Sequence, residues 1–511
     1  MASSRTEKTV ASTWKLPAVT VSRTVPAVDT EIVLVLQGEN RKIIVPSKAK
    51  YADLLRKFAK GDAFQARHGA VQFMRFSGKR GARNVAFLGM GKSADLTPEK
   101  ARQAAAAAWA KLAAEKVSSA AVSMDGVLAH AAHARAFLEG MLLNAYSFNK
   151  YKKAAEPSVA LSKLVLVSAD RAVMGHLQDE ARRALAVAEA VNITRDWSNE
   201  PSNFGTPDFY AAEAMRYSRQ YGIKCRVLSE ADARREGMEL FLAVGQGSTR
   251  EGRIVVMEYL PKDVKDSKDL KTIAFVGKGI TFDSGGISIK PSLRMEDMKH
   301  DMTGAATLFG ATLLAAALKV PNRIVTILAF TENMPDGSAI QPGNVVRARN
   351  GKTVEIINTD AEGRLILAVV LDYAHEFNPD VIIDAATLTG AVVIALGKHC
   401  AALIGNDDGL IEGLREAGGE NHERLWQLPM FDEYLDDLKS DTADLKNSAN
   451  DSSGGTIRGA VFMAQFIRKG QKWAHLDIAA TAYGMGHVPY FPKKGASGIY
   501  VRTLAQFAAE F

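Results

Sequence analysis

Cysteine is scarce in this sequence: Cys225 and Cys400 are the two that occur among 511 residues. They are far apart and lack the close spacing of zinc ligands, which argues against a disulfide framework and a zinc–cysteine site. The His-Glu-x-x-His pattern, which places two metal-binding histidines on one helix in many one-zinc proteases, is also absent. These absences exclude the usual one-zinc protease helix.

Long apolar runs are missing as well, and none approaches the roughly 20 residues that are needed to span a bilayer. The first residues, Met1–Lys8, contain no apolar segment of the kind found in a secretory signal. We therefore expect a cytoplasmic protein with no membrane partner. The net charge of +7 would permit contact with nucleic acid, but the basic residues are scattered, which favours a solvated surface.

The length is sufficient for more than one domain. Residues 1–170 are expected to form an N-terminal α/β domain, because short apolar runs that are typical of strands alternate with helical segments. Its expected strands are 32–36, 84–88 and 163–167, and its expected helices are 97–117 and 129–146. Residues 171–192 are expected to form a connecting helix, followed by a loop at 197–203. Residues 193–511 are then expected to form a larger C-terminal domain.

Near-continuous apolar runs in the C-terminal portion are typical of strands that are buried on both faces. The expected strands are 253–257, 272–276, 323–330 and 381–385, and helical runs separate several of them. Residues 344–356, with Asn350-Gly351 inside, are expected to form a β-hairpin. The fold class predicted from this alternation is α/β, with a mainly parallel central sheet flanked by helices.

The segment 276–291 carries unusual chemistry next to a buried strand. It contains Lys278, Asp283 and Lys290, together with four glycines and a proline that predict a sharp turn after the strand. Charges beside a buried strand end are costly unless they are paired or bind a metal. A turn with solvated charges is the simplest alternative, and this segment alone does not exclude it.

Further carboxylates follow at the expected starts of helices. Asp301 precedes a helical run at 303–318, while Asp360 and Glu362 precede another at 365–377. Each one singly could be an ordinary helix cap. With Asp283, however, they occupy successive strand-to-helix junctions, which lie along one edge of an open α/β sheet. Four neighbouring carboxylates repel one another unless cations lie between them, so the pattern predicts a pair of divalent metal ions.

Two segments, Gly277–Pro291 and Asn358–Arg364, closely resemble the signature stretches of the leucyl aminopeptidase family, the two-metal hexameric cytosolic exopeptidases. The resemblance covers the chain from about Asn192 to the end. It implies a homohexamer that acts on peptides with two divalent ions per subunit. The ligands that the resemblance assigns to the tighter ion are Lys278, Asp283, Asp301 and Glu362, and those of the more exchangeable ion are Asp283, Asp360 and Glu362.

The same resemblance implies the chemistry. A water between the ions attacks the scissile carbonyl, and Lys290 stabilises the oxyanion. Arg364 is expected to hold a bicarbonate that acts as general base, although a structural salt bridge would also explain this arginine. Zinc, manganese, magnesium or cobalt would suit these ligands. The neutral amine of Lys278 binds a metal after losing its proton, which a nearby cation promotes.

The resemblance also implies an apolar pocket for Leu-like first residues. Its expected lining residues are Met298, Asn358, Thr387, Leu388 and Gly390. The sequence departs from the family in two places. Ala480 stands where glycine is usual, and Ser497-Gly498-Ile499-Tyr500 replaces the usual Thr-Gly-Arg-Pro. These departures affect the details of the pocket rather than the expected chemistry.

Three alternatives remain open at the level of sequence. Ser284 could belong to a serine-nucleophile loop, although Phe282 stands where such loops have glycine one residue before the Asp-Ser pair. The same metal site could serve a dipeptidase of the cysteinylglycine type. A DNA-binding regulator with an inherited metal site is the alternative outside enzymology, and salt-dependent binding to DNA would support it.

Overall fold

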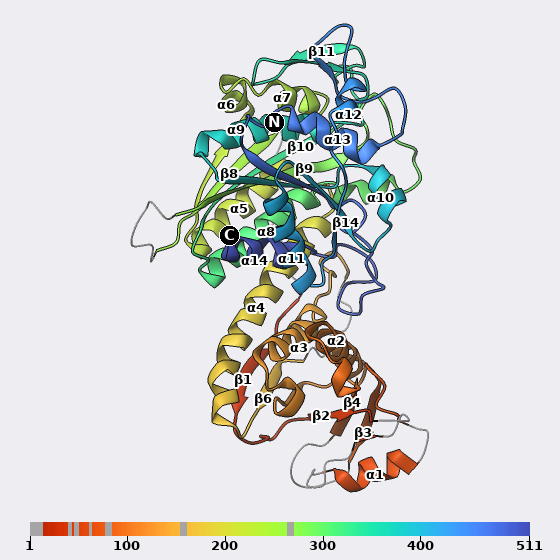
Figure 1. Cartoon of the computed structure of the whole chain (residues 1–511). Coiled ribbons are helices and arrows are strands. Elements are labelled where there is room, and N and C mark those ends of the chain that lie inside the picture. The colour runs from red at the N-terminus through yellow and green to blue at the C-terminus, as the bar shows by residue number, and fades with distance from the viewer. Residues whose placement is uncertain are drawn as a thin grey trace, which may run out of the picture. The chain divides into compact units, whose positions relative to one another are not determined.

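The computed structural model describes residues 14–38, 43–44, 51–60, 64–76, 84–153, 161–262 and 270–511, so the expectation for Met1–Lys8 lies outside these residues. The chain divides into two compact units (Figure 1). The first comprises Met1–Asn192 and Gly486–Lys493, and the second comprises Ile193–Met485 and Lys494–Phe511. The chain therefore leaves the second unit for eight residues near its C-terminal end.

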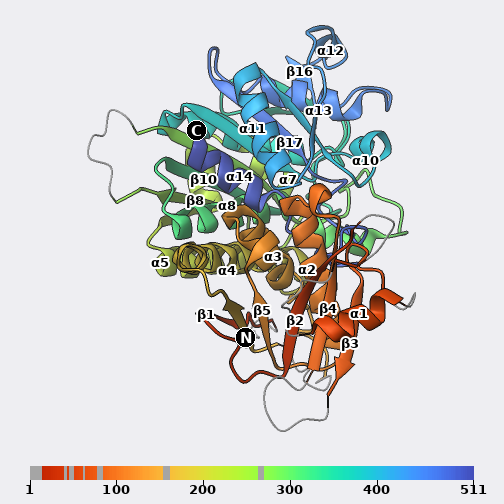
Figure 2. The ribbon, with the colours of Figure 1, turned by 60° about the horizontal axis from the view of Figure 1, so that its bottom comes forward.

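The first unit is built on a six-stranded sheet with the order β1-β6-β5-β2-β4-β3. All neighbouring strands run parallel except the edge pair β3 and β4. The strands are β1 (Ala18–Ser22), β2 (Thr30–Leu36), β3 (Val71–Arg75), β4 (Asn84–Gly91), β5 (Ser119–Ser123) and β6 (Lys163–Val167). The helices are α1 (Ala52–Lys60), α2 (Pro98–Ala114), α3 (Ala131–Leu143) and the first part of α4 (Arg171–Asn199) (Figure 2). The predicted strands 32–36, 84–88 and 163–167 correspond to β2, β4 and β6, and they and the predicted helices that correspond to α2 and α3 are confirmed to within a few residues. No prediction was made for β1, β3 or β5.

Helix α2 shows why the local sequence predicts its structure well. Thr97 caps the helix by accepting a hydrogen bond from the backbone N–H of Lys100, and Pro98 occupies the first turn, where no N–H is needed. Small residues then allow α2 and α3 to pack closely. A Cβ atom on Gly140 would lie 2.0 Å from the carbonyl oxygen of Arg102, so glycine is required at this crossing.

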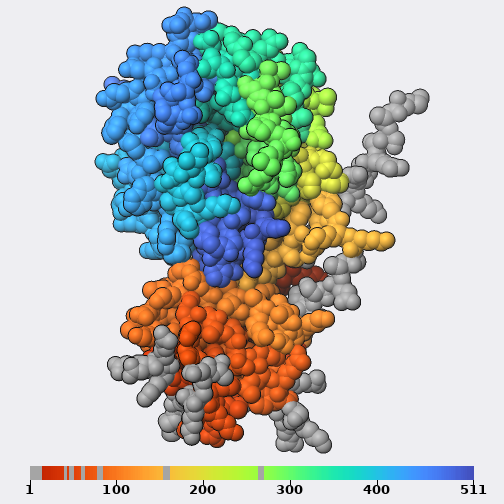
Figure 3. All heavy atoms as spheres, turned by 90° about the vertical axis from the view of Figure 1, so that its right-hand side faces the viewer, coloured from red at the N-terminus to blue at the C-terminus, as the bar shows by residue number. Residues whose placement is uncertain are grey.

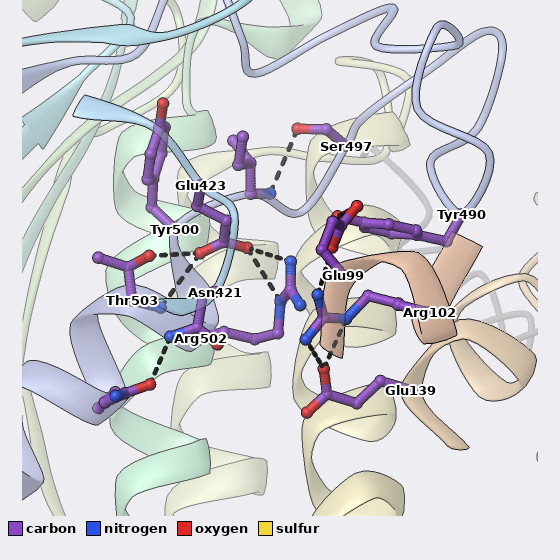
Figure 4. A network of polar contacts seen from close by, with 12 residues as sticks. Glu99, Arg102, Glu139, Asn421, Glu423, Tyr490, Ser497, Tyr500, Arg502 and Thr503 are labelled. Carbon is purple, nitrogen blue, oxygen red and sulfur yellow. Dashed lines mark hydrogen bonds and ion pairs between the residues drawn. The ribbon is translucent and has the colours of Figure 1, made fainter. Parts of the chain in front are cut away.

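Buried charges of the first unit meet around Arg102 (Figure 4). Its guanidinium pairs with Glu139 at 3.0 Å and with Glu99. Tyr490, from the late segment Gly486–Lys493, donates its hydroxyl to Glu99 at 3.1 Å, and Arg102 faces its ring. The late segment is therefore held in the first unit by specific polar contacts.

The second unit contains an eight-stranded sheet with the order β15-β14-β17-β13-β9-β10-β8-β7. Its four central strands, from β17 to β10, run parallel, and both flanks add antiparallel neighbours. Its strands are β7 (Lys224–Leu228), β8 (Arg253–Tyr259), β9 (Thr272–Asp283), β10 (Arg323–Asn333), β13 (Val381–Ala386), β14 (Ala401–Gly405), β15 (Leu425–Gln427) and β17 (Lys472–Asp477). The predicted α/β class with a mainly parallel central sheet is confirmed.

A separate three-stranded sheet contains the predicted hairpin, β11 (Asn344–Arg347) and β12 (Thr353–Ile356), with β16 (Leu445–Lys446) beside it. The helices are α5 (Pro207–Tyr221), α6 (Glu230–Arg235), α7 (Glu239–Gly245), α8 (Thr303–Leu318), α9 (Gly363–Ala374), α10 (Gly390–Leu396), α11 (Asp408–Glu420), α12 (Glu433–Asp436), α13 (Gly455–Ala464) and α14 (Val501–Glu510). On the face seen in Figure 3, green, cyan and blue segments that are far apart in the sequence adjoin.

Helices cover both faces of the large sheet. Helix α9 packs on one face of β9, with α7 and α13 beside it, whereas α8 packs on the opposite face with α5 and α14. The stretch Met295–Leu318 is long and apolar enough to cross a membrane by length and composition alone, contrary to the sequence expectation. However, 83% of its most apolar window is buried inside the protein, so it is weak evidence for a membrane span.

The largest differences from the predicted boundaries are in α4 and β9, which each extend seven residues beyond the predicted end. Helix α4 continues through Trp197 to Asn199, where a loop was expected. The indole of Trp197 stacks on Phe309 at 3.8 Å between ring centroids, so tertiary packing stabilises this last turn. Strand β9 continues beyond Val276 to Asp283, through the glycines that were expected to end it.

Candidate metal centre

The long strand β9 carries Lys278 into the interior instead of into a turn. Gly277 and Gly279 flank it because there is no room for larger residues: a Cβ atom on Gly277 would lie 2.7 Å from Cα of Ala305 in α8. On Gly279 it would lie 2.5 Å from the carbonyl oxygen of Ala329. The glycines thus mark close packing inside the sheet, and Lys278 points to the opposite face, towards the start of α9.

The ammonium of Lys278 is fully buried and makes three contacts. It lies 2.8 Å from Oδ2 of Asp301 and 3.0 Å from Oε1 of Glu362, and it donates to the carbonyl oxygen of Thr387 at 2.9 Å. Ligand oxygens of Asp283, Asp301 and Glu362 all lie within 4.8 Å of one another. Three of the expected carboxylates and the expected lysine therefore converge on one buried point.

Lys290 and Asp360 form the outer part of the same cluster. Nζ of Lys290 lies 2.7 Å from Oδ2 of Asp283 and 2.5 Å from Oδ1 of Asp360. The side chain of Lys290 is 21% exposed, whereas that of Lys278 is 3% exposed. Lys290 therefore lies where the buried carboxylates meet solvent.

Backbone and hydroxyl groups fix the loops that carry these residues. The hydroxyl of Thr359 donates to the carbonyl oxygen of Gly285 at 2.6 Å and accepts from the N–H of Ser288 at 2.8 Å. The hydroxyl of Ser288 in turn accepts from the N–H of Thr359 at 3.1 Å. Asn447 braces the second loop by donating to the carbonyl oxygen of Asn358 at 2.6 Å. The loop after β9 and the loop before α9 are thus held together.

Electrostatics in the cluster favour a bound cation. Burial, together with the neighbouring Asp283 carboxylate, raises the pKa of Glu362 to about 8 and that of Asp301 to about 6. Burial alone would lower the pKa of Lys278, but Asp301, Glu362 and Asp283 raise it above its ordinary value. Four carboxylates face two ammonium groups, so negative charge is in excess when all are ionised.

The donor set fits a divalent metal. Oε2 of Glu362 is buried and has no hydrogen-bond partner among the residues that the structure describes. A buried carboxylate oxygen without a partner is costly, and a metal ion would satisfy it. Asp283, Asp301 and Glu362 supply oxygen ligands, Asp360 lies beside them, and Lys278 could add a nitrogen after losing its proton.

Arg364 is the second residue of α9 and is also buried. Its Nη1 donates to the carbonyl oxygen of Asn447 at 2.8 Å, while its Nε has no acceptor within the described part of the chain. Burial lowers the pKa of Arg364 to about 10, although Glu362 and Asp477 oppose this effect. The salt bridge to the metal-site carboxylates that was considered as an alternative is not seen among the described ion pairs. An unpaired buried donor suits a small anion.

The residues expected to line the pocket are placed as follows. The hydroxyl of Thr387 donates to Oδ1 of Asp301 at 2.8 Å, and the N–H of Leu388 donates to Asp477 at 3.1 Å. Asn358 accepts from the N–H of Asp360 at 2.9 Å. Met298 is half-buried three residues before Asp301, and Gly390 is exposed at the start of α10.

Both departures from the family pattern lie in packed structure. Ala480 is buried against Val392 and Ala402. The buried hydroxyl of Tyr500 donates to the carbonyl oxygen of Arg424 at 2.9 Å and accepts from the N–H of Ala401 at 2.9 Å. These contacts tie the replaced segment to the end of the sheet at β14.

The serine-nucleophile alternative does not match the geometry of Ser284. Its buried hydroxyl donates to the carbonyl oxygen of Asn333 at 2.7 Å and accepts from the N–H of Gly286 at 3.2 Å. Both partners are backbone groups, whereas a nucleophilic serine needs a neighbouring base. Ser284 therefore stabilises the turn after β9.

Sequence reasoning missed several polar residues that shape the centre, among them Asn333, Thr359 and Asn447. Asn333 ends the apolar strand β10, and a polar residue at the end of such a strand was the available signal. Asn447 lies in a polar segment rich in glycine and serine, residues 438–455, which is typical of a surface loop, and its position gave no signal in the sequence. Its side chain is nevertheless fully buried.

Comparison with known families decides the identity of the chain. The model described as "Cytosol aminopeptidase family, catalytic domain" matches residues 192–505, which is more than half of the sequence. The N-terminal domain model of the same family matches residues 37–155. The chain belongs to the cytosol aminopeptidase family. The resemblance inferred from Gly277–Pro291 and Asn358–Arg364 is therefore confirmed.

Relatives in the cytosol aminopeptidase family are similar over nearly the whole chain. A probable cytosol aminopeptidase of Geobacter sp. (strain M21) is 40% identical over 479 residues, which cover 92% of this chain and 94% of that protein. One from Bdellovibrio bacteriovorus is 40% identical over 449 residues, which cover 86% and 88%. Two solved structures of the bottromycin maturation enzyme BotP, one in complex with Mn, are 32% identical. They cover 95% of this chain and 99% of theirs, with TM-scores of 0.81 and 0.82.

Membership of the cytosol aminopeptidase family makes the chain a hydrolase of the metal-dependent aminopeptidase class. Its substrates are accordingly peptides. The two-domain architecture agrees with the pair of family models. The buried acidic cluster is where this family member has residues suited to bind metal.

Gly363, which starts α9 directly after Glu362, offers a test of the packing around Lys278. A Cβ atom there would lie 2.7 Å from both Cε and Nζ of Lys278. We expect Gly363→Ala to displace the lysine and to weaken divalent-metal binding about 10-fold. Alanine favours a helix over glycine by about 1 kcal/mol, and this gain offsets the cost of displacing Lys278, so thermal stability should change little. Calorimetric metal titration would measure the effect, and Gly390→Ala, where a Cβ atom meets nothing within 4 Å, is the control. Unchanged affinity in Gly363→Ala would contradict the expectation.

Proposed function

We propose that this protein is a leucyl aminopeptidase that removes Leu-like apolar residues from the N-termini of peptides at a centre of two divalent metal ions. The observation that supports the proposal most strongly is the convergence of Lys278, Asp283, Asp301 and Glu362 on one buried point, where Oε2 of Glu362 has no partner among the described residues. Zn²⁺ or Mn²⁺ are the ions we propose, with Mg²⁺ or Co²⁺ as substitutes.

Each side chain has a proposed part in binding. Lys278, Asp283, Asp301 and Glu362 would hold the tighter ion, and Asp283, Asp360 and Glu362 the more exchangeable one, with the backbone carbonyl of Asp360 added. When bound, the two ions would activate a water for attack on the scissile carbonyl. The free amine of the substrate would anchor at the exchangeable position, which explains attack next to the N-terminus.

Lys290 and Arg364 are the proposed catalytic residues. The charged ammonium of Lys290, at the rim of the carboxylate cluster, would donate to the oxyanion that develops as the carbonyl is attacked. The buried Nε of Arg364 would hold a bicarbonate that accepts the proton of the attacking water. Met298, Asn358, Thr387, Leu388 and Gly390 would line the pocket for the first side chain of the substrate.

The proposal extends to the setting of the enzyme. We propose a homohexamer in the cytoplasm, in which residues 1–170 form the N-terminal domain, 171–192 the connecting helix and 193–511 the catalytic domain. This arrangement follows from the family resemblance. A dipeptidase that acts on cysteinylglycine would use the same metal centre and differ in its pocket.

Chelation tests the function directly. Purified protein should hydrolyse leucine amide, lose this activity after dialysis against a chelator, and recover it with Mn²⁺ or Zn²⁺. N-acetyl-leucine amide should resist cleavage, because its amine is blocked. Activity that is indifferent to the chelator would refute the metal mechanism. Cysteinylglycine cleaved much faster than Leu-Gly would replace the leucine preference by the dipeptidase alternative.

A further inference from the structure

Asn333 is a buried residue at the end of β10 that touches both loops of the metal centre. Its side-chain Nδ2 donates to Oδ1 of Asp283 at 2.8 Å and to the carbonyl oxygen of Thr359 at 3.0 Å. Its backbone carbonyl accepts from the N–H of Ser284 at 3.0 Å and from the Ser284 hydroxyl at 2.7 Å. One residue therefore binds the loop after β9 and also the loop that leads into α9.

The register of β9 and β10 explains how Asn333 reaches Asp283. The two parallel strands pair regularly up to Thr331 and Ile280, but the next pair is Glu332 with Phe282. Thr281 is thus an extra residue in β9, which makes a β-bulge. Beyond the bulge, Asn333 pairs with Asp283.

The same bulge explains why the side chains of Lys278 and Asp283 lie on one face of the sheet. Lys278 and Asp283 are five residues apart, and in a regular strand an odd spacing puts two side chains on opposite faces of the sheet. Nevertheless, Asp283 shares the cluster with Asp301 and Glu362, which are the two carboxylates that Lys278 contacts. The extra residue at Thr281 turns the side chain of Asp283 to the same face of the sheet as that of Lys278. Asn333 then holds the carboxylate of Asp283 in this orientation.

The two carboxylate oxygens of Asp283 have different partners. Oδ1 accepts from the N–H of Gly285 at 2.9 Å and from Asn333, whereas Oδ2 faces Lys290 at 2.7 Å. Two donors on Oδ1 fix the rotation of the carboxylate about its side-chain bonds. The space beside the side chain of Asn333 is filled, because a Cβ atom on Gly286 would lie 2.7 Å from Oδ1 of Asn333.

We propose that Asn333 is a positioning residue of the metal centre. Its amide sets the orientation of Asp283 and ties the segment that carries Asp360 and Glu362 to the end of β9, and it thereby sets the affinity of the centre for a divalent cation. This inference rests on the proposed metal site. Hydrogen bonds that orient metal-binding carboxylates typically contribute 10- to 100-fold to metal affinity.

The test compares two changes in the same strand. Asn333→Leu keeps nearly the same shape and removes both donated hydrogen bonds. Thr331→Val is the matched control, because Thr331 is buried two residues earlier and its hydroxyl has no hydrogen-bond partner among the described residues. The full-length proteins are stripped of metal and titrated with Mn²⁺ in a calorimeter, and their melting temperatures are measured with and without Mn²⁺.

We expect Asn333→Leu to bind Mn²⁺ 10- to 100-fold more weakly and to lose most of the rise in melting temperature that Mn²⁺ gives the unchanged protein. Thr331→Val should behave like the unchanged protein in both measurements. If Asn333→Leu does not fold, Asn333→Ser, whose short side chain cannot reach both acceptors, takes its place with the same expected result.

Two outcomes are distinguishable from each other. If the unchanged protein binds no Mn²⁺, Zn²⁺, Mg²⁺ or Co²⁺, the proposed metal centre itself fails. If the unchanged protein binds Mn²⁺ and Asn333→Leu binds it equally well, with a melting temperature lowered to the same extent in both states, Asn333 has a purely structural role. That second result would overturn the inference and leave the proposed function intact.

Discussion

Changing the pH from 8 to 6 is expected to weaken metal binding by about 10⁴-fold, because protons compete with the metal for its ligands. Burial and the Asp283 carboxylate raise the pKa of Glu362 to about 8, so this group carries a proton at neutral pH until a cation displaces it. Lys278 must also lose its proton to act as a ligand, and its neighbouring carboxylates hold its pKa above the ordinary value.

The direction and the steepness of the pH dependence of metal affinity follow from Glu362 and Lys278. A raised pKa favours the protonated form, which cannot bind metal, so affinity falls as the pH decreases through about 8. With one proton displaced from Glu362 and one from Lys278, each pH unit below 8 costs roughly 100-fold. Asp301, with a pKa raised to about 6, steepens the loss further below pH 6.

Calorimetric titration at pH 7, in buffers with different ionisation enthalpies, counts the released protons. We expect about two per ion at the tighter position in the unchanged protein and about one in Lys278→Met. A control variant, Lys472→Met, removes an exposed lysine that pairs with Asp407 and should release the same number as the unchanged protein. The same count in the unchanged protein and in Lys278→Met would mean that Lys278 remains an ammonium and does not bind the metal.

The second large effect concerns Lys290. Lys290→Met should lower kcat for leucine amide by about 10²- to 10³-fold while metal affinity stays within a few-fold. Burial alone would lower the pKa of Lys290, but Asp283, Glu362, Asp360 and Asp301 raise it, so the ammonium stays charged throughout the working pH range. Methionine retains most of the aliphatic stem and removes the charge that would stabilise the oxyanion.

Kinetics and metal content must be measured on the same samples. Lys271→Met changes an exposed lysine immediately before the other end of β9 and should leave both quantities unchanged. If kcat of Lys290→Met falls only in proportion to lost metal, the lysine stabilises the cluster and has no part in the chemical step. A kcat equal to that of the unchanged protein would exclude it from both tasks.

Local rules predicted the elements whose sequence and surroundings agree. Thr97 and Pro98 mark the start of α2, and the apolar run 303–318 coincides with α8. The family resemblance added the roles of Lys278 and Lys290 to the predicted cluster of carboxylates, since Lys278 alone would be an improbable residue for a buried strand. The carboxylates at the starts of helices were informative because parallel strands bring those junctions to one edge of the sheet.

Other features depend on contacts that no local pattern encodes. Gly277 and Gly279 suggested a turn, but their lack of side chains serves the close approach of α8 and β10. Trp197 looked like part of a loop, yet its stacking on Phe309 keeps it helical. The extra residue at Thr281 becomes visible only when β9 is aligned with β10, so the link between Asn333 and Asp283 could not be foreseen from either strand alone.

The late segment Gly486–Lys493 affects which parts of the gene can be exchanged with a related gene by recombination. A crossover placed at the boundary near residue 192 would exchange nearly all of the first unit as one piece. It would nevertheless leave behind eight residues, encoded almost 300 codons downstream, that belong to the same compact unit. Tyr490 would then meet a foreign partner in place of Glu99. The two halves of the gene are therefore expected to be inherited together, because the phenol and its carboxylate must remain matched.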